Sequence, residues 1–169
     1  DGADYTWERP ISTQQTGFSF VSQSRSWLPD AIGGVLWYGV DDTYFTCYVP
    51  LYCGINAVPE SFARGNLGKF SWDTAWWVVN FVANFANIKY SYMKEDIQKV
   101  QGELEGGFLD GQPEVEKKAA ELYKVSPAKA EEYLTKYSDE AGERVVARWR
   151  QLGQDLLGNV VGRVTLNPP

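Results

Sequence analysis

Histidine is absent from this sequence of 169 residues. Without an imidazole, the chain cannot form a Ser–His–Asp triad or a Cys–His dyad. It also lacks the ligand on which nearly all catalytic zinc sites depend. The sequence therefore excludes these classes of hydrolytic site within the chain itself.

Cysteine is almost as scarce, because Cys47 and Cys53 are the only two. An extended strand holds residues at this spacing about 20 Å apart, at ~3.3 Å per residue, which is beyond the reach of a disulfide. The two thiols pair only if the chain reverses near Pro50. The sequence thus implies no disulfide framework, and its cysteines leave the cellular compartment open.

Positive charge is also in short supply, since 16 Lys and Arg face 22 Asp and Glu and give a net charge of −6. Nucleic-acid-binding proteins carry a basic stripe, which is missing here, and the negative charge also disfavours an anionic membrane surface. The chain has no signal peptide or long apolar run. Because it opens at Asp1 rather than Met, we expect a preceding segment, and both a cytoplasmic and a periplasmic parent protein stay open.

Aromatic side chains are abundant, with seven Trp, ten Tyr and eight Phe. Each buried ring removes on the order of 150–250 Å² from water, so a sizeable core can form. The composition changes near residue 90: six of the seven Trp lie at or before Trp77, and 11 of the 16 Lys and Arg follow Met93. We therefore predict an α+β fold, with an antiparallel β region over residues 1–70 and a helical region over residues 71–169.

The first part of the chain alternates apolar and polar residues in a pattern typical of an antiparallel meander. A short hairpin loop at residues 41–43 separates the second strand from the third. Pro50 ends the third strand or marks it as an edge, because proline donates no hydrogen bond to the ladder. The predicted strands cover residues 16–25, 34–41 and 44–51.

A Gly- and Pro-rich loop at residues 53–70 precedes the first helix. Ser71 is a good N-cap for a helix that begins at Trp72 and is apolar on nearly all sides. A second apolar stripe with helical spacing runs from Met93 to Leu104, and Gly106 and Gly107 are expected to end it.

Two later helices are indicated by Pro113 and Pro127, which occupy predicted first helical positions. The N-cap of the second of these helices is Ser126. The last amphipathic stripe consists of Val145, Trp149, Leu152 and Leu156.

Three linked blocks of sequence resemble the C-terminal third of the dipeptidase A family, to which the secernins are related. The resemblance extends over residues 7–105, and the blocks match in order rather than as one short pattern. The blocks are ERPISTQQTGFSFVSQSRSWLPDAIGGVLWYGVDD, YFTCYVPLYCGINAVPESFARG and FSWDTAWWVVNFVANF.

This resemblance implies an αββα sandwich of two antiparallel sheets and a cysteine hydrolase with an N-terminal nucleophile. In that family, autoprocessing exposes a Cys whose thiol attacks the peptide carbonyl while its own α-amine serves as the base. An α-amine titrates near pH 7.7–8.0, so the chemistry needs no histidine. Since Asp1 is the first residue and neither cysteine is terminal, we expect the catalytic Cys on a preceding stretch and expect this chain alone to be inactive.

Four side chains are candidates for a substrate pocket. Arg25 either lies near the nucleophile or clamps a substrate carboxylate, or it is a strand-end residue paired with Asp30. Gln15 and Gln23 either orient a peptide through amide hydrogen bonds or supply polarity to a solvated strand face. Trp37 either lines the pocket or packs in the core.

Other conspicuous residues have structural interpretations. Neither Cys47 nor Cys53 has a basic neighbour in sequence that would lower the pKa of its thiol, so neither is expected to be catalytic. Asp41 and Asp42 adjoin at a turn but have too few further oxygen ligands nearby for a calcium site. The Lys and Glu runs over residues 114–148 are typical of solvated helix faces with i,i+4 pairs.

Three functions are compatible with these observations. The parent protein hydrolyses dipeptides, or it hydrolyses another amide with the same fold, or the Trp-rich region is a non-enzymatic module that binds a peptide or a sugar. The expected partners are a dipeptide substrate and the missing N-terminal part of the same polypeptide, and a homo-oligomer is compatible with the sequence. We expect no cofactor, no metal, no nucleic acid and no membrane.

Overall fold

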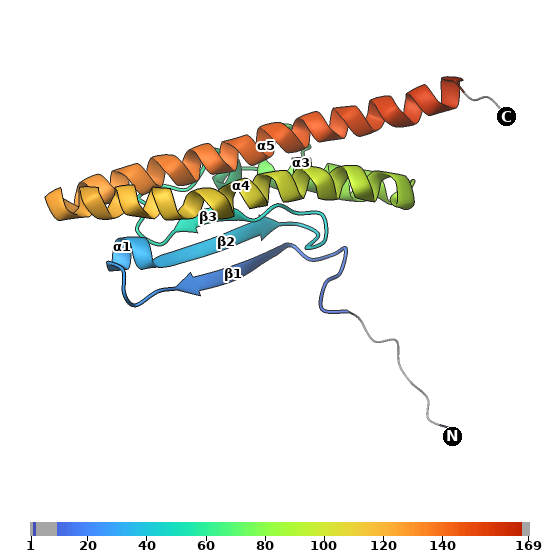
Figure 1. Cartoon of the computed structure of the whole chain (residues 1–169). Helices are drawn as coiled ribbons and strands as arrows, with labels where there is room; N and C mark the ends of the chain where they lie inside the picture. Colours follow the sequence, from blue (N-terminus) through green and yellow to red (C-terminus); the bar gives the residue numbers. More distant parts are fainter. Residues whose placement is uncertain (1, 3–9, 167–169) are drawn as a thin grey trace.

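The computed structural model describes residue 2 and residues 10–166, so the start of the region that carries the resemblance lies outside the described residues. Two long antiparallel helices, α4 (Tyr90–Val125) and α5 (Pro127–Leu166), lie side by side along a three-stranded sheet (Figure 1). The strand farthest from these helices is β1. The arrangement confirms the predicted α+β class.

The sheet has the order β1-β2-β3, and both of its strand pairs are antiparallel. The first two predicted strands are confirmed, but the third begins at Val49 rather than at Tyr44. The backbone before Val49 bonds to α4 instead of β2: the Glu105 carboxylate accepts the Tyr48 N–H at 2.9 Å, and the Gln101 amide donates to the Thr46 carbonyl at 2.7 Å. The strands are β1 (Phe18–Ser24), β2 (Gly34–Val40) and β3 (Val49–Tyr52).

The outer edge of β3 is closed by α5. Pro50 lies opposite Trp37, at a position where its nitrogen points away from β2, so no ladder hydrogen bond is lost. The Ser138 hydroxyl donates to the Pro50 carbonyl at 3.0 Å and accepts the Tyr52 N–H at 3.4 Å. These contacts confirm Pro50 as an edge residue and satisfy backbone groups that would otherwise be unpaired at the edge.

Three shorter helices precede the long pair in the chain. α1 (Asp30–Gly33) is one helical turn within the loop between β1 and β2, and α2 (Glu60–Ala63) lies in the predicted long loop. α3 (Ala75–Ala86) begins three residues after the predicted start. The reason is local: the Ser71 hydroxyl accepts the Asp73 N–H at 3.1 Å and forms a tight turn instead of capping a helix.

The prediction that a helix ends at Gly106–Gly107 is wrong, because α4 continues through both glycines. The prediction that Pro113 starts a helix is wrong for the same reason, since Pro113 lies inside α4. The packing of an apolar stripe outweighs the poor helix propensity of these residues. Buried members of the stripe lie on both sides of the glycines: Met93, Ile97, Val100, Phe108, Val115 and Ala119.

The start of α5 at Pro127 is as predicted, since a proline at the first helical position has no hydrogen bond to lose. Its predicted apolar stripe is also confirmed, because Val145, Trp149, Leu152 and Leu156 are all buried. They pack in one core with the sheet, α3 and α4. Within the described residues, no helix is both long enough and apolar enough to cross a membrane.

Candidate functional site

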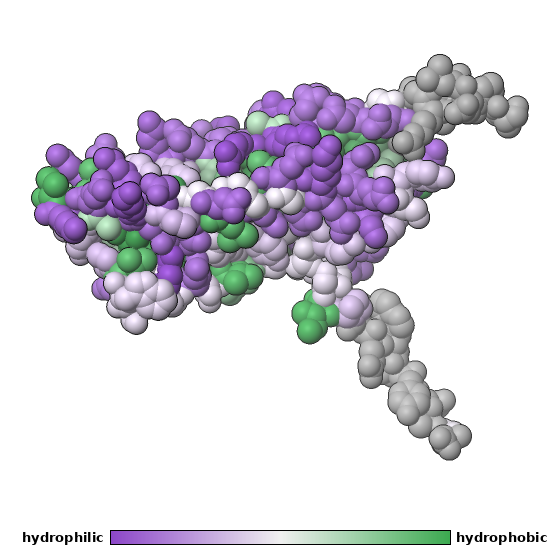
Figure 2. Space-filling view, in the orientation of Figure 1, coloured by the Kyte–Doolittle hydropathy of each residue, from purple (hydrophilic) through white to green (hydrophobic). Residues whose placement is uncertain are grey.

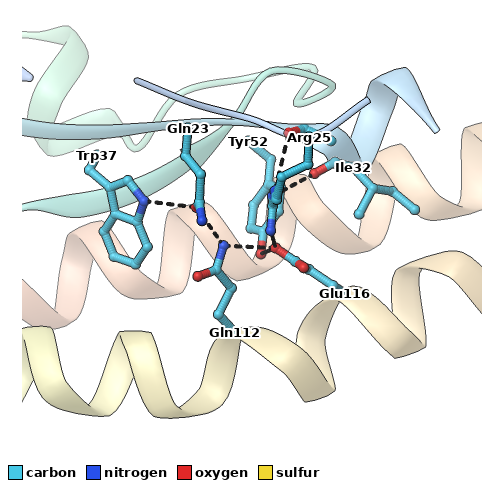
Figure 3. Close-up of polar contacts among 8 residues, drawn as sticks. Gln23, Arg25, Ile32, Trp37, Tyr52, Gln112 and Glu116 are labelled. Atoms are coloured by element: carbon cyan, nitrogen blue, oxygen red, sulfur yellow. Dashed lines mark hydrogen bonds and ion pairs between the residues drawn. The ribbon is translucent and has the colours of Figure 1, made fainter. Parts of the chain in front are cut away.

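A polar network connects the end of β1 to α4, and it contains three of the four predicted pocket residues. Figure 3 shows Gln23, Arg25 and Trp37 of the sheet region pointing toward Gln112 and Glu116, which project from α4. The network lies at the end of the β1–β2 ladder next to α1. Three side-chain hydrogen bonds join the β region to α4 at this place.

Arg25 is the cation of this network, and its side chain is only 9% exposed. Its guanidinium forms an ion pair with the Glu116 carboxylate and donates to the carbonyls of Ile32 and Gly33, at 3.1 Å and 3.3 Å. The partner is therefore Glu116, far away in sequence, rather than Asp30. The guanidinium fixes the loop after β1 and has its donors directed at protein acceptors.

Glu116 accepts three hydrogen bonds on one carboxylate oxygen, and its side chain is 14% exposed. Besides Arg25, the donors are the Tyr52 hydroxyl at 3.2 Å and the Gln112 amide at 2.8 Å. Burial, followed by the negative charge of Glu116, raises the pKa of Tyr52 far above its ordinary value of 10.0. Tyr52 therefore stays protonated and acts as a donor. The assignment of Glu116 to a solvated helix face is wrong.

Gln23 connects this ion pair to the core. The Gln112 amide donates to the Gln23 side-chain oxygen at 2.8 Å, and the Trp37 indole N–H donates to the same oxygen at 3.3 Å. Trp37 is buried, as expected of a core aromatic that satisfies its N–H. Gln15 is exposed in the turn before β1 and does not join the network.

Sequence reasoning missed Gln112, Glu116 and Tyr52. A signal was nevertheless available, because polar residues of α4 recur at intervals of three, four or seven and so share one face of a helix. All of them bond to the β region or to the loop before β3. The set is Gln98, Gln101, Glu105, Gln112 and Glu116.

A second polar feature lies at the opposite end of the β1–β2 ladder, where Asp41 and Asp42 follow β2. Both are buried, with 3% and 8% of their surfaces exposed. Asp41 has a φ of 64°, in the left-handed region that residues other than glycine rarely adopt. Burial is the main cause that raises the pKa of Asp41, while the hydrogen bond from Asn80 at 3.0 Å opposes the rise.

Neither cysteine has the surroundings of a nucleophile. Both thiols are free. Cys47 is buried, and its burial, followed by the nearby charge of Glu105, raises the pKa of its thiol. Cys53 is exposed in the turn after β3, and no Lys, Arg or His lies within ten residues of it in sequence. Within residues 10–166, no group of three or more acidic, cysteine or histidine side chains could hold a metal ion.

Trp37, Trp76 and Trp77 do not form a flat ligand-binding platform. Trp37 is buried, and Trp76 and Trp77 are half-buried with their ring planes at 81° to each other. Trp77 donates its indole N–H to the Asn66 carbonyl at 2.9 Å, which fixes the loop before α3. These rings therefore behave as packing residues.

Comparison with known proteins gives two matches. The sequence model of peptidase family C69 matches residues 2–103, which is more than half of the chain. A protein of Latilactobacillus sakei named as a probable dipeptidase is 31% identical over 101 residues, or 58% of this chain. The matched region is 21% of that relative, so the chain spans about a fifth of its length.

Proposed function

This chain belongs to peptidase family C69, and from that premise we propose that it is part of a dipeptidase that hydrolyses dipeptides. The proposal rests on the family match together with the name of the Latilactobacillus sakei relative. In this assignment, the 169 residues contribute a sheet and the helices that cover it. The reacting groups are supplied by a larger polypeptide, since the relative extends well beyond the matched region.

We place the nucleophile, an N-terminal Cys, on polypeptide that precedes this chain. The surroundings of both cysteines support this placement. Cys47 is buried with a raised thiol pKa, and Cys53 has no Lys, Arg or His within ten residues of it in sequence. The network around Arg25 then forms part of the scaffold, because the charge of Arg25 is already balanced by Glu116.

The outer edge of β1 supports the presence of further sheet. Residues whose N–H and C=O point away from β2 alternate along an antiparallel strand. In β1 these are Phe18, Phe20, Ser22 and Ser24, and their backbone groups have no hydrogen bond to any other described residue. Figure 2 shows hydrophilic residues over the long helices and paler, partly hydrophobic residues on the side where β1 lies.

An edge of this kind attracts another strand, and proteins normally protect it. β3 is protected by Ser138, whereas β1 exposes both its backbone and its rings, with Phe18 57% and Phe20 55% exposed. We infer that the preceding part of the same polypeptide adds a strand to this edge and covers the two phenylalanines.

Activity of the full-length protein tests the proposed reaction. We expect it to release free amino acids from a panel of dipeptides, and a Cys-to-Ala change at its mature N-terminus should abolish the release. Hydrolysis of acyl-amides but not of dipeptides would support the alternative function, hydrolysis of another amide by the same fold. Equal dipeptide hydrolysis by both forms would refute the mechanism.

Proline substitution in the full-length protein tests whether a strand is added to the outer edge of β1. Ser22→Pro removes an N–H that points away from β2, so on a free edge it is tolerated. If a strand is added there, the substitution breaks a ladder hydrogen bond and lowers stability by about 2–3 kcal/mol. Val21→Pro, which removes an N–H directed at β2, is the matched control and destabilises in either case. A melting temperature unchanged by Ser22→Pro would exclude the added strand.

A further inference from the structure

Asp41 and Asp42 are two adjacent buried carboxylates without a cation among the described residues. Asp41 accepts the Asn80 amide on one oxygen, while its other oxygen is buried and has no hydrogen-bond partner in residues 10–166. Asp42 accepts the Tyr44 N–H at 2.9 Å on one oxygen, and its other oxygen has no partner among the described residues. A buried carboxylate normally has a counter-charge or a full set of donors.

Asp42 lines a cavity of about 310 Å³ that lies between the segment before β1, the loop after β2 and the junction of α3 with α4. This volume is at the small end of the usual range for ligand pockets, roughly 300–1,000 Å³. The lining combines polar groups with aromatic rings. It consists of Ser12, Thr13, Gln14, Asp42, Tyr44, Phe45, Asn87 and Tyr90.

The rings belong to one cluster beside the acid. Tyr44 and Tyr90 stack with their centroids 6.4 Å apart, and Phe45 contacts both rings. Aromatic faces attract cations, and a carboxylate supplies the charge-assisted hydrogen bond. The combination selects a small organic cation with N–H donors. A metal ion fits poorly, because no third acidic, cysteine or histidine ligand is available in the described part of the chain.

We propose that this cavity binds the free α-ammonium group of the substrate through Asp42 and the rings of Tyr44 and Tyr90. The inference rests on the proposed dipeptidase function, because a dipeptide carries a free α-ammonium group, which an N-acylated peptide lacks. A primary ammonium has three donors, and Asp42 offers it an acceptor without a partner. The strained backbone at Asp41 holds the acid in place.

A Lys or Arg side chain from the rest of the polypeptide is the second candidate cation for this cavity. The two sources differ in whether the cavity is open to a small amine. The probe is therefore L-alaninamide, with its neutral counterpart N-acetyl-L-alaninamide, and calorimetry measures the binding of each to the full-length protein at pH 6.5. At this pH an α-amine is protonated.

We expect the full-length protein to bind L-alaninamide at least about tenfold more tightly than the acetylated probe. Asp42→Asn should weaken L-alaninamide binding about 10- to 100-fold, because it removes the charge from a charge-assisted hydrogen bond. The amide oxygen of asparagine still accepts the Tyr44 N–H, so the turn is retained. Asp110→Asn, at an exposed acid on α4, is the matched control and should leave both affinities unchanged.

Tyr90→Leu provides a second variant at an exposed ring, where folding is not at risk. It should weaken L-alaninamide binding about two- to fivefold. Equal binding of both probes, or no effect of Asp42→Asn, would overturn the inference and leave a cation of the polypeptide itself as the occupant. Preferential binding of L-alaninamide by a protein that hydrolyses no dipeptide would support the amine site while removing the proposed function.

Discussion

The ion pair between Arg25 and Glu116 gives the sharpest prediction about stability. Glu116→Ala leaves the Arg25 guanidinium, 9% exposed, without a counter-charge, and it also removes the acceptor of Tyr52 and Gln112. We expect this change to lower the free energy of unfolding by about 3–5 kcal/mol, the usual cost of removing one partner from a buried pair. Glu114→Ala is the control: Glu114 is 80% exposed and its pair with Lys117 spans 3.9 Å, so its loss should cost under about 0.5 kcal/mol.

Urea unfolding followed by tryptophan fluorescence measures both variants. With a slope of roughly 2 kcal/mol per molar urea, a loss of about 4 kcal/mol lowers the midpoint by about 2 M. A double-mutant cycle with Arg25→Met separates the pair from its surroundings, because Arg25 also donates to the carbonyls of Ile32 and Gly33. The double variant should be less destabilised than the sum of the single ones.

If Glu116→Ala shifts the midpoint no more than Glu114→Ala does, the carboxylate is not the counter-charge that balances Arg25. Arg25 would then be free to hold a substrate carboxylate, as one reading of the sequence has it. A loss of dipeptide affinity in Arg25→Lys without a loss of stability would point the same way.

Three further outcomes are expected. The raised pKa of Tyr52 favours the neutral phenol in the folded state, so its contribution to stability is complete below pH 10 and is lost as the pH rises beyond it. Tyr52→Phe should therefore make the alkaline decline in the free energy of unfolding shallower, by up to ~1.4 kcal/mol per pH unit, as measured by urea unfolding at a series of pH values. A thiol reagent should label Cys53 in the native protein and Cys47 only after unfolding, and rapid labelling of both would contradict the burial of Cys47. Gly102→Ala should stabilise the protein by about 0.5–1 kcal/mol, because the added Cβ meets open space. Gly142→Ala should destabilise it, because the added Cβ would lie 2.6 Å from the Pro59 ring. Equal shifts of the urea midpoint in the two variants would refute the comparison.

The strands could be predicted from the sequence where neighbours along the chain determine the structure. β1 and β2 alternate with period two and are separated by Gly and Pro, so both were recoverable. β3 was placed too early, because residues 44–48 are strand-like in sequence. Their backbone groups bond elsewhere: the N–H groups of Tyr44 and Phe45 donate to Asp42, and Thr46 and Tyr48 bond to α4. Contacts between Tyr48 and Glu105 span 57 positions and leave no local mark.

The helices illustrate the opposite limit. Gly106, Gly107 and Pro113 signal a helix end by local propensity, yet α4 passes through all three. Packing of the apolar stripe on both sides decides the outcome, and propensity is only a weak prior. Polar residues of the candidate site followed the same rule: Gln23, Arg25 and Trp37 could be named from the strand, whereas their partners on α4 required the fold.

The two ends of the β1–β2 ladder differ in whether their buried charges are balanced. At one end Arg25 has its charge balanced by Glu116 and also donates to the carbonyls of Ile32 and Gly33, so this end stabilises the fold. At the other end Asp41 and Asp42 are both buried; among the described residues, one Asp41 oxygen has no hydrogen-bond partner and neither acid forms an ion pair with a Lys or Arg. Because a balanced buried pair has little to gain from a ligand and an unbalanced acid has much, we propose that substrate is recognised at the end with Asp42 rather than at the end with Arg25. Substitutions at Glu116 should therefore change stability without changing the preference for an ammonium group, and those at Asp42 should do the reverse.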